Sequence, residues 1–480
     1  MKKYLIILSI LVLFLNGCIK KKPEENTKTL AVKNDVACYS DLDNILKRDT
    51  LIAITGYNAY SYFIYRGQPM GYEYELLNLF AKHLGVHLKI VVDKELTQMF
   101  DDLENCRGDL IAYSLTVTSE RKKRFAFTVP LHSTKQVLVQ RRPAGWRRMT
   151  LDQIRARLVT NPLQLVGKDV YVSAGSAYIQ RLKNLSDEIG GGINVIVADS
   201  NLTTEDLIKM VAEGEIDYTV ADENIADMNQ AYYSNLDVSV EISFPQNIAW
   251  AVRKTSVNLL RKLNEWIEKE KKKTEYYVIY QRYFENRLAY RRRLKSEFFS
   301  HAGGKISEYD ELIKKYAAEL GWDWRILASL IYEESHFNPK AKSWAGAIGL
   351  MQLMPVTAKQ YNVTNPENPS ENLKAGIKYL KWLDDFWADY IKDKDERIKF
   401  VLASYNIGLG HIQDARRLAE KYGANPNLWD GNVEVYLLKK SEPKYYNDKV
   451  VKFGYISGKQ TVKYVREILN RYLQYKKFIS

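Results

Sequence analysis

The hydrophobic pattern of the chain changes from one kind to another near residue 300. Between residues 51 and 290, short apolar runs typical of buried strands alternate with amphipathic segments of helical periodicity. This alternation predicts an α/β fold with mostly parallel sheets. Beyond Ser307 the strand-like runs stop, and the helical spacing that remains predicts a separate, mainly α domain. The segments with this spacing are 308–320, 324–335, 372–387 and 397–405.

The composition is that of a globular protein with more than one domain. Apolar residues make up 46% of the 480 residues and charged residues 27%, which excludes a wholly disordered or fibrous chain. At roughly 100–200 residues per domain, two to four domains are expected. The net charge of 71 − 58 = +13 suits an anionic partner such as nucleic acid, membrane lipid or an acidic polymer, without choosing among them.

The N-terminus has the features of an export signal. A basic start precedes an apolar run at 5–15, which is too short to span a bilayer. The run ends in Gly17 and Cys18, and this ending resembles a bacterial lipobox, which implies cleavage before Cys18 and lipidation of that residue. The alternative is an ordinary signal with a chance cysteine. Since residue 19 is Ile rather than Asp, the resemblance implies an outer-membrane anchor facing the periplasm, and export argues against nucleic acid as a partner.

The other two cysteines, Cys38 and Cys106, could pair in an oxidising compartment or could be two buried thiols.

We predict five segments from these patterns. The segments are a signal peptide at 1–17, a lipid-anchored tether at 18–40, an α/β domain at 41–290, a basic linker at 291–306 and a helical domain at 307–480.

Three motifs in the α/β region resemble those of periplasmic solute-binding proteins that bind amino acids. The motifs are Gly67-Gln-Pro-Met-Gly-Tyr-Glu-Tyr74, Leu115-Thr-Val-Thr-Ser-Glu-Arg121 followed by Phe125-Ala-Phe-Thr-Val-Pro130, and Gly214-Glu-Ile-Asp-Tyr-Thr-Val-Ala-Asp222. The resemblance implies two α/β lobes that close on a ligand, joined by hinge strands at 137–141 and 248–252. Lobe 1 would comprise 41–139 and 244–290, and lobe 2 would comprise 140–243.

The same resemblance assigns ligand roles to four residues. Arg121 would clamp an α-carboxylate, for which a planar guanidinium is suited, and Thr116 would add a hydroxyl. Asp222 would pair with an α-ammonium, and Tyr60 would wall the side-chain pocket. The alternatives are a solvated basic turn for Arg121 and a helix cap for Asp222. Gly175-Ser176-Ala177 stands where relatives often have two hydroxyl residues, so one carboxylate contact would be missing.

A single glutamate stands out in the helical region. In a helix over 324–335, Ile326, Leu327, Leu330 and Ile331 form one apolar stripe, and Glu334 falls in its middle. Burial raises the pKa of a carboxyl, as a general acid near neutral pH requires. The alternative is a glutamate at the helix end that emerges into solvent.

Four further motifs resemble those of the family 1 lytic transglycosylases of peptidoglycan. They are Glu334-Ser335-His-Phe-Asn-Pro339, Gly346-Ala-Ile-Gly-Leu-Met-Gln-Leu-Met-Pro355, Ser404-Tyr405-Asn406-Ile-Gly408 and Tyr464-Val465, in that order. The resemblance implies a goose-lysozyme-like fold and peptidoglycan glycan strands as the substrate. Ser404 in place of Ala is a departure, but a small one.

The family resemblance also assigns the active-site roles. Glu334 would be the acid/base and Tyr464 would support it. Ser335 would orient the substrate, Met351 would lie against a sugar face, and Gln352 would hydrogen-bond to the glycan. Tyr405 and Asn406 would hold Glu334 and the N-acetyl group. Core packing is the alternative for Met351, and Met354 is expected in the core.

The implied mechanism needs one carboxylate where most glycosidases use two. Glu334 would protonate the bond between N-acetylmuramic acid and N-acetylglucosamine, and then deprotonate the C6 hydroxyl that closes a 1,6-anhydro ring. We expect neither metal nor cofactor, because the six histidines lack ligand spacing.

The order of the segments resembles that of the membrane-bound lytic murein transglycosylase F group. This order suggests that an amino acid or small peptide bound to the first domain gates the enzyme. The alternatives are a lysozyme-type hydrolase using the same glutamate and a non-catalytic receptor or wall-binding lipoprotein.

Overall fold

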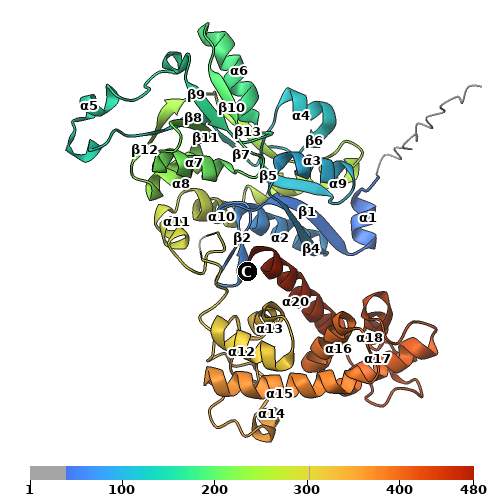
Figure 1. The fold of residues 1–480 in the computed structure, drawn as a ribbon. Coiled ribbons are helices and arrows are strands. Elements are labelled where there is room, and N and C mark those ends of the chain that lie inside the picture. Colours follow the sequence, from blue (N-terminus) through green and yellow to red (C-terminus); the bar gives the residue numbers. More distant parts are fainter. Residues whose placement is uncertain (1–38, 302, 480) are drawn as a thin grey trace, which may run out of the picture. The chain divides into compact units, whose positions relative to one another are not determined.

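The computed structural model describes residues 39–301 and 303–479 (Figure 1). The predicted signal peptide, Cys18 and nearly all of the predicted tether lie outside these residues. Cys106 is disulfide-bonded, and the other two cysteines of the chain, Cys18 and Cys38, both fall outside the described part. Every helix in 39–301 and 303–479 is too short or too polar to cross a membrane.

The first domain contains two mixed sheets, one in each lobe. In the first sheet β1 pairs parallel with β4 and β5, while β13 runs antiparallel to β5, β6 and β7. Its strand order is β4 (His87–Asp93), β1 (Thr50–Gly56), β5 (Leu110–Thr116), β13 (Gln246–Arg253) and β6 (Phe125–Phe127), with β7 (His132–Thr134) also on β13. In the second sheet β9 pairs parallel with β10 and β11, while β8 is antiparallel to β11 and β12. Its order is β10 (Asn194–Val197), β9 (Asp169–Val172), β11 (Tyr218–Asp222), β8 (Gln136–Arg141) and β12 (Leu236–Glu241).

The chain crosses twice between the two sheets, and one crossing differs from the predicted lobe boundary. β7 belongs to the first sheet and β8 to the second, so the first crossing lies at residue 135 rather than at 139/140. The second crossing lies between β12 and β13, around the predicted boundary at 243/244. The strands that follow the two crossings, β8 and β13, run antiparallel to their neighbours. The sheets are therefore mixed rather than mostly parallel.

Helices cover the sheets with amphipathic faces. In α2 (Tyr72–Leu84) the side chains of Leu76, Leu77, Phe80 and Ala81 are buried, which stabilises the fold by about 1.5–3 kcal/mol for each large side chain. The other helices of this domain are α1 (Leu42–Lys47), α3 (Leu96–Glu104), α4 (Ser119–Arg124), α5 (Leu151–Arg155), α6 (Ala177–Ile189), α7 (Thr204–Glu213), α8 (Glu223–Tyr232), α9 (Val257–Glu270) and α10 (Thr274–Phe284), with short turns η1 (Trp146–Arg148) and η2 (Pro162–Leu165) and a hairpin of β2 (Phe63–Tyr65) and β3 (Gln68–Met70).

The segment predicted as a basic linker, 291–306, is instead packed against the first lobe. Its first residues complete α11 (Arg287–Leu294), in which Arg293 is buried. After α11, the backbone N–H of Ser300 donates to the carbonyl of Ile64 at 3.0 Å and so pairs the segment with β2. Burial costs a guanidinium less free energy when aromatic ring faces replace its hydrating water. Sequence periodicity does not reveal such contacts. The rings around Arg293 are those of Phe63, Tyr283 and Tyr290.

The second domain is helical, as predicted (Figure 1). The four predicted helices correspond to α12, α13, α15 and α16, and α13 has the predicted bounds. Its helices are α12 (Asp310–Leu320), α13 (Trp324–Ser335), α14 (Pro355–Gln360), α15 (Pro369–Ala388), α16 (Lys394–Ile407), α17 (Leu409–Lys421), α18 (Glu434–Lys439), α19 (Pro443–Tyr446) and α20 (Lys459–Phe478), with an irregular turn, η3 (Trp429–Val433), before α18. One apolar core fills this domain, and it also includes Ile64 of β2. Together the two domains have the predicted fold class.

Candidate active site and ligand cleft

Helix α13 places Glu334 in its last turn. The Asp323 side chain caps the start of the helix by accepting the N–H of Arg325 at 3.0 Å. All four residues of the predicted stripe are buried, so the helix is fixed in the core. It ends because His336 adopts a left-handed conformation with φ +51°. Glu334 is therefore half-buried at the edge of the core, neither fully enclosed nor projecting into solvent.

The environment of Glu334 suits a general acid. The Tyr464 hydroxyl donates to Oε1 of Glu334 at 2.5 Å. Burial raises the pKa of the Glu334 carboxyl to about 7, against the bond from Tyr464, which lowers it, while the charge of Glu333 raises it further. Near neutral pH a large fraction of the group thus carries a proton, as proton donation to a leaving oxygen requires.

The neighbouring acid, Glu333, is turned away into an ion pair. Arg471 on α20 donates through Nη2 to Oε2 of Glu333 at 2.8 Å and through Nη1 to the carbonyl of Ser329 at 3.2 Å. Its guanidinium also lies 4.2 Å from the ring centre of Tyr332. Sequence reasoning missed Arg471, although it follows Tyr464 by seven residues and so shares its helix face. Arg471 thus joins α13 to α20. Its ion pair also engages the carboxylate of Glu333, the second acid next to Glu334.

Ser335 supports the active-site loop rather than the substrate. Its side chain is buried, and its hydroxyl donates to the carbonyl of Leu350 at 2.8 Å and to that of Ile331 at 3.2 Å. The predicted role in orienting the sugar is therefore replaced by a role in joining α13 to the loop at 349–353. A motif shows that a small hydroxyl is needed at this position, but not the direction in which it points.

The burial of the two methionines, Met351 and Met354, is the reverse of the prediction. Met351 is fully buried, whereas Met354 is 44% exposed, so Met351 does not lie against a sugar and Met354 is not in the core. Met351 fills the space beside Gly376 of α15, where an added Cβ would lie 2.3 Å from the sulfur. A flexible thioether fits such a gap, and this is the core alternative for Met351.

A buried asparagine that sequence reasoning missed organises the same loop. Asn372 on α15 accepts the N–H of Met351 at 2.8 Å and donates to the carbonyls of Ile348 at 3.0 Å and Pro366 at 2.9 Å. Gly349 has φ +86°, and a Cβ there would lie 2.2 Å from the Asn372 amide nitrogen. The sequence did contain a signal for Asn372, because a polar residue beside the apolar stripe of a predicted helix usually has a hydrogen-bond partner.

Gln352, Tyr405 and Asn406 have distinct places around the loop. The Gln352 amide donates to the carbonyls of Ala341 at 3.0 Å and Gly349 at 2.9 Å, so this donor is used within the loop. The Tyr405 hydroxyl donates to the Met351 carbonyl at 2.7 Å, and the nearby charge of Glu334 helps to raise the Tyr405 pKa. Tyr405 therefore connects the loop to the acid.

Asn406 is exposed, and its Oδ1 accepts the hydroxyl of Thr461 at 2.7 Å. This bond uses the acceptor end of the amide and leaves its donor end to a substrate. Ser404, the departure from the family motif, is buried and accepts the indole N–H of Trp387 at 2.9 Å. Ala could not make that bond, so the departure adds a partner for the indole.

In the first domain, one cavity between the lobes is lined by all four predicted ligand residues, Tyr60, Thr116, Arg121 and Asp222. The Arg121 guanidinium donates to the carbonyl of Thr116 at 2.9 Å and to that of Gly175 in lobe 2 at 3.0 Å, so it is not a solvated basic turn. Three of its five N–H donors remain for a carboxylate. The ring of Tyr60 is buried, and its hydroxyl bonds to the Tyr290 hydroxyl at 2.8 Å.

Asp222 is buried at the end of β11, 2% exposed, and makes no capping bond to α8. Its Oδ1 has no hydrogen-bond partner among the described residues. Burial raises the pKa of the Asp222 carboxyl to about 7, against the nearby Tyr178 and Arg121, which lower it. Such a group is prepared for a cationic partner. Sequence reasoning missed a second acid in this cavity, Glu205 at the start of α7.

Comparisons with known proteins agree with both halves of the chain. The model of the bacterial extracellular solute-binding proteins, family 3, matches residues 51–286, and that of the transglycosylase SLT domain matches residues 311–427. A crystal structure of a mutant of ArgBP from T. maritima is 27% identical, with a TM-score of 0.42, over 50% of this chain and 98% of that one.

Two curated relatives match almost the whole chain. The membrane-bound lytic murein transglycosylase F of Desulfosudis oleivorans is 36% identical over 429 residues, which is 89% of this chain and 90% of that protein. The protein of the same name from Pseudomonas putida is 34% identical over 436 residues, or 90% and 86% of the two chains. The chain therefore belongs to the membrane-bound lytic murein transglycosylase F family.

Proposed function

We propose that this chain cleaves the β-1,4 bond between N-acetylmuramic acid and N-acetylglucosamine in peptidoglycan and leaves a 1,6-anhydro end. The observation that carries the proposal is the pairing of one half-buried carboxyl, Glu334, with the hydroxyl of Tyr464. The adjacent Glu333 is committed to Arg471. This arrangement supports a reaction run by a single carboxylate, since a hydrolysing pair would need a second one free.

The reaction balances with Glu334 alone. Its proton passes to the glycosidic oxygen as the bond to C1 breaks, and the N-acetylglucosamine leaves with a free hydroxyl. The 2-acetamido group of the muramic sugar shields the developing positive charge at C1, and the donor end of the Asn406 amide would orient such a group. The Glu334 carboxylate then takes the proton of the C6 hydroxyl as its oxygen bonds to C1. No water is consumed, and Glu334 ends protonated.

The masses of the products test this proposal. Purified sacculi digested with the chain should release muropeptides that are lighter by one water than the products of a lysozyme on the same sacculi. A digest made in ¹⁸O water should leave the new ends unlabelled, because the ring oxygen comes from the sugar itself. Products of full mass that carry ¹⁸O would instead identify a hydrolase that uses the same glutamate.

We further propose that lipidation of Cys18 anchors the protein at the outer membrane, facing the periplasm. The lipobox-like sequence before Cys18 supports this, and so does the word membrane-bound in the names of the relatives. Membrane fractionation of a Cys18→Ala variant tests it, because loss of the anchor should move the chain out of the outer-membrane fraction.

We also propose that an amino acid bound in the first domain gates the enzyme through α20. The C-terminal half of this helix lies on lobe 1, where the Tyr475 hydroxyl donates to the Gly67 carbonyl at 2.6 Å and the Lys477 ammonium to the Val92 carbonyl. Its N-terminal half carries Tyr464, which holds Glu334. A helix is stiff over this length, so a shift at one end reaches the other.

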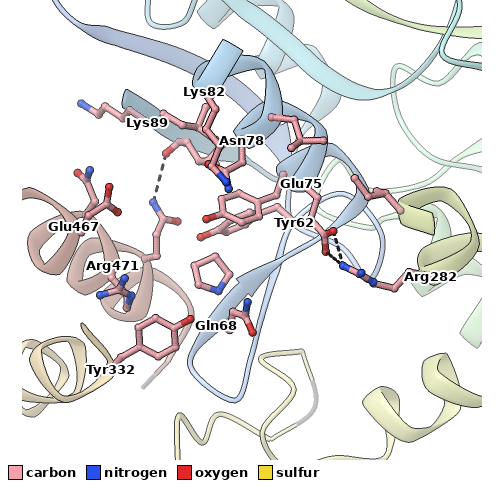
Figure 2. Close-up of a pocket in the computed structure, with 18 of the residues that line it drawn as sticks. Tyr62, Gln68, Glu75, Asn78, Lys82, Lys89, Arg282, Tyr332, Glu467 and Arg471 are labelled. Carbon is pink, nitrogen blue, oxygen red and sulfur yellow. Dashed lines mark hydrogen bonds and ion pairs between the residues drawn. The ribbon is translucent and has the colours of Figure 1, made fainter. Parts of the chain in front are cut away.

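The junction between lobe 1 and the helical domain is hollow at its centre, with a cavity of about 500 Å³ (Figure 2). Figure 2 shows Glu467 and Arg471 of α20 and Tyr332 of α13 on one side of it, across from Tyr62 and Asn78 of lobe 1. An incompletely filled junction can rearrange at lower cost than a close-packed one, which suits a part that moves.

Phe478 links this junction to the ligand cavity. Its ring stacks on Tyr57 with centroids 3.7 Å apart, and the next residue, Asn58, lines the ligand cavity. The Asn58 Oδ1 accepts the N–H groups of Tyr60 and Ser61 at 3.0 and 2.6 Å. Closure of the lobes on a ligand therefore acts on the segment that contacts the end of α20.

Replacing Phe478 by Ala should uncouple the two domains. In the wild type, an equimolar mixture of L-amino acids should change turnover about fivefold or more, a typical coupling between sites. In Phe478→Ala this change should fall below about twofold, while turnover without amino acids is kept. Kinetics of sacculus digestion measure both, with Lys476→Ala, an exposed change two residues earlier on the same helix, as the control. An unaltered response in Phe478→Ala would exclude this route.

A further inference from the structure

The ligand cavity contains a second acid, half-buried Glu205, that the amino-acid-binding roles above leave unused. Glu205 stands in the first turn of α7, in lobe 2, and lines the same cavity as Asp222. Its Oε1 is buried and, like Oδ1 of Asp222, has no hydrogen-bond partner among the described residues. A buried carboxylate oxygen without a donor is costly, and two in one cavity call for a ligand that supplies donors.

The two acids face one shared space. Tyr113 and Tyr178 both line the cavity, and burial together with the charges of Glu205 and Asp222 raises the pKa values of both phenols. The backbone of Ala59 in lobe 1 lies near the Glu205 carboxyl of lobe 2. Burial raises the pKa of the Glu205 carboxyl to about 7, the same value as that of Asp222.

When both acids are ionised, the charges in the cavity do not balance without a cation. Arg121 is the half-buried positive group, and it offsets one of the two carboxylates. Lys94 also borders the cavity, but it is exposed, so its charge is solvated and screened. One negative charge therefore remains when both acids are ionised, and a zwitterionic ligand of zero net charge does not neutralise it.

We propose that this cavity takes an amino acid with a second ammonium group on its side chain, a diamino acid. Its carboxylate would lie on Arg121, its α-ammonium on Asp222 and its side-chain ammonium on Glu205. The cavity volume of about 60 Å³ is small, which favours a single amino acid over a peptide. This inference rests on the proposed binding of an amino acid by the first domain and names its class.

A neutral side chain would be disfavoured for a physical reason. It would leave the buried Oε1 of Glu205 without a donor, and sites built to bond a polar group discriminate strongly against an analogue that lacks it. The competing arrangement has both carboxylates on one α-ammonium. In that arrangement Glu205 does not bind the side chain of the ligand, so the two arrangements predict different ligand preferences.

The test compares pairs of ligands that differ only by the terminal amino group. Isothermal titration of the full chain would measure lysine against norleucine, ornithine against norvaline and 2,3-diaminopropionate against alanine. At least one diamino acid should bind about tenfold or more tightly than its neutral partner, as expected for one charge-assisted hydrogen bond. In Glu205→Gln this preference should fall to within about threefold. Glu213→Gln, an exposed change on the same helix, should keep it.

The remaining outcomes separate the inference from the proposal on which it rests. If neutral and diamino acids bind equally and both weaken in Glu205→Gln, the two acids share the α-ammonium and the inference is wrong, while amino-acid binding stands. If a preference for diamino acids persists unchanged in Glu205→Gln, Glu205 does not read the side chain. If none of the six compounds binds, the proposed amino-acid site and the inference fail together. Thermal unfolding of each variant shows that it is folded.

Discussion

Sacculi treated with a Glu334→Gln variant should be digested about 1,000-fold more slowly than with the wild type. The amide keeps the shape of the side chain and can still accept the hydrogen bond of Tyr464, but it has no proton to give. General acid catalysis contributes typically 10²–10⁴-fold, and this site has one such group free for the task. Release of soluble muropeptides over time measures the rate. Glu319→Gln, an exposed change on α12, is the control.

The pH dependence of the same reaction separates the acid role from a structural one. The wild-type rate should fall as the pH rises through about 7, because the protonated form of Glu334 is lost. The residual rate of Glu334→Gln should lack this limb. If the variant digested sacculi as fast as the wild type, Glu334 would not be the catalyst.

The Glu334 carboxyl should lower the free energy of unfolding at high pH. Its pKa is raised in the folded state, so between its unfolded value near 4.5 and about 7 the folded chain binds more protons than the unfolded one. The free energy of unfolding therefore decreases as the pH rises through this window. Above pH 7 the Glu334→Gln variant should unfold at a higher temperature than the wild type, which also shows that its inactivity is not misfolding.

Replacing Asn372 by Ala should have the second large effect, on both stability and activity. Three backbone groups, at Ile348, Met351 and Pro366, would lose their partner in the interior. Each unpaired buried group costs about 1–3 kcal/mol, so a loss of at least about 3 kcal/mol is expected from the three groups. The loop that holds Tyr405 would lose its fixed shape, and sacculus digestion should fall at least tenfold.

Urea unfolding followed by circular dichroism measures the first effect, with Asn447→Ala as the matched control. Asn447 is an exposed asparagine of the same domain, so its removal should change the free energy of unfolding by less than about 0.5 kcal/mol. Equal unfolding curves for the two variants would contradict the role of Asn372 in the loop.

Much of the fold and the central pair of the site could be predicted from the sequence. Periodicity gave the bounds of α13 to the residue, because a long apolar stripe is a strong local signal. The motifs led to Glu334 and Tyr464, which the structure brings together although 130 residues separate them. In the first domain they led to Arg121 and Asp222, which line one cavity.

The rest depended on which way a side chain points, and local patterns do not record that. Met351 and Met354 are chemically alike and three residues apart, so their chemistry does not tell which one is buried. The serine of the catalytic motif turned to the loop because a carbonyl there needed a donor. Arg293 looked like part of a charged linker, but one of its aromatic partners, Phe63, lies far away in the sequence.

The place of Tyr464 on α20 has a consequence for the cell that makes this protein. The ribosome completes Glu334 and its helix long before residue 459, so a nascent chain displays the acid without the phenol that holds it. Chains interrupted before α20, or cut by a protease ahead of it, would carry an incomplete centre. An enzyme that acts on the cell wall of its own host thus becomes competent only after α20 has been synthesised.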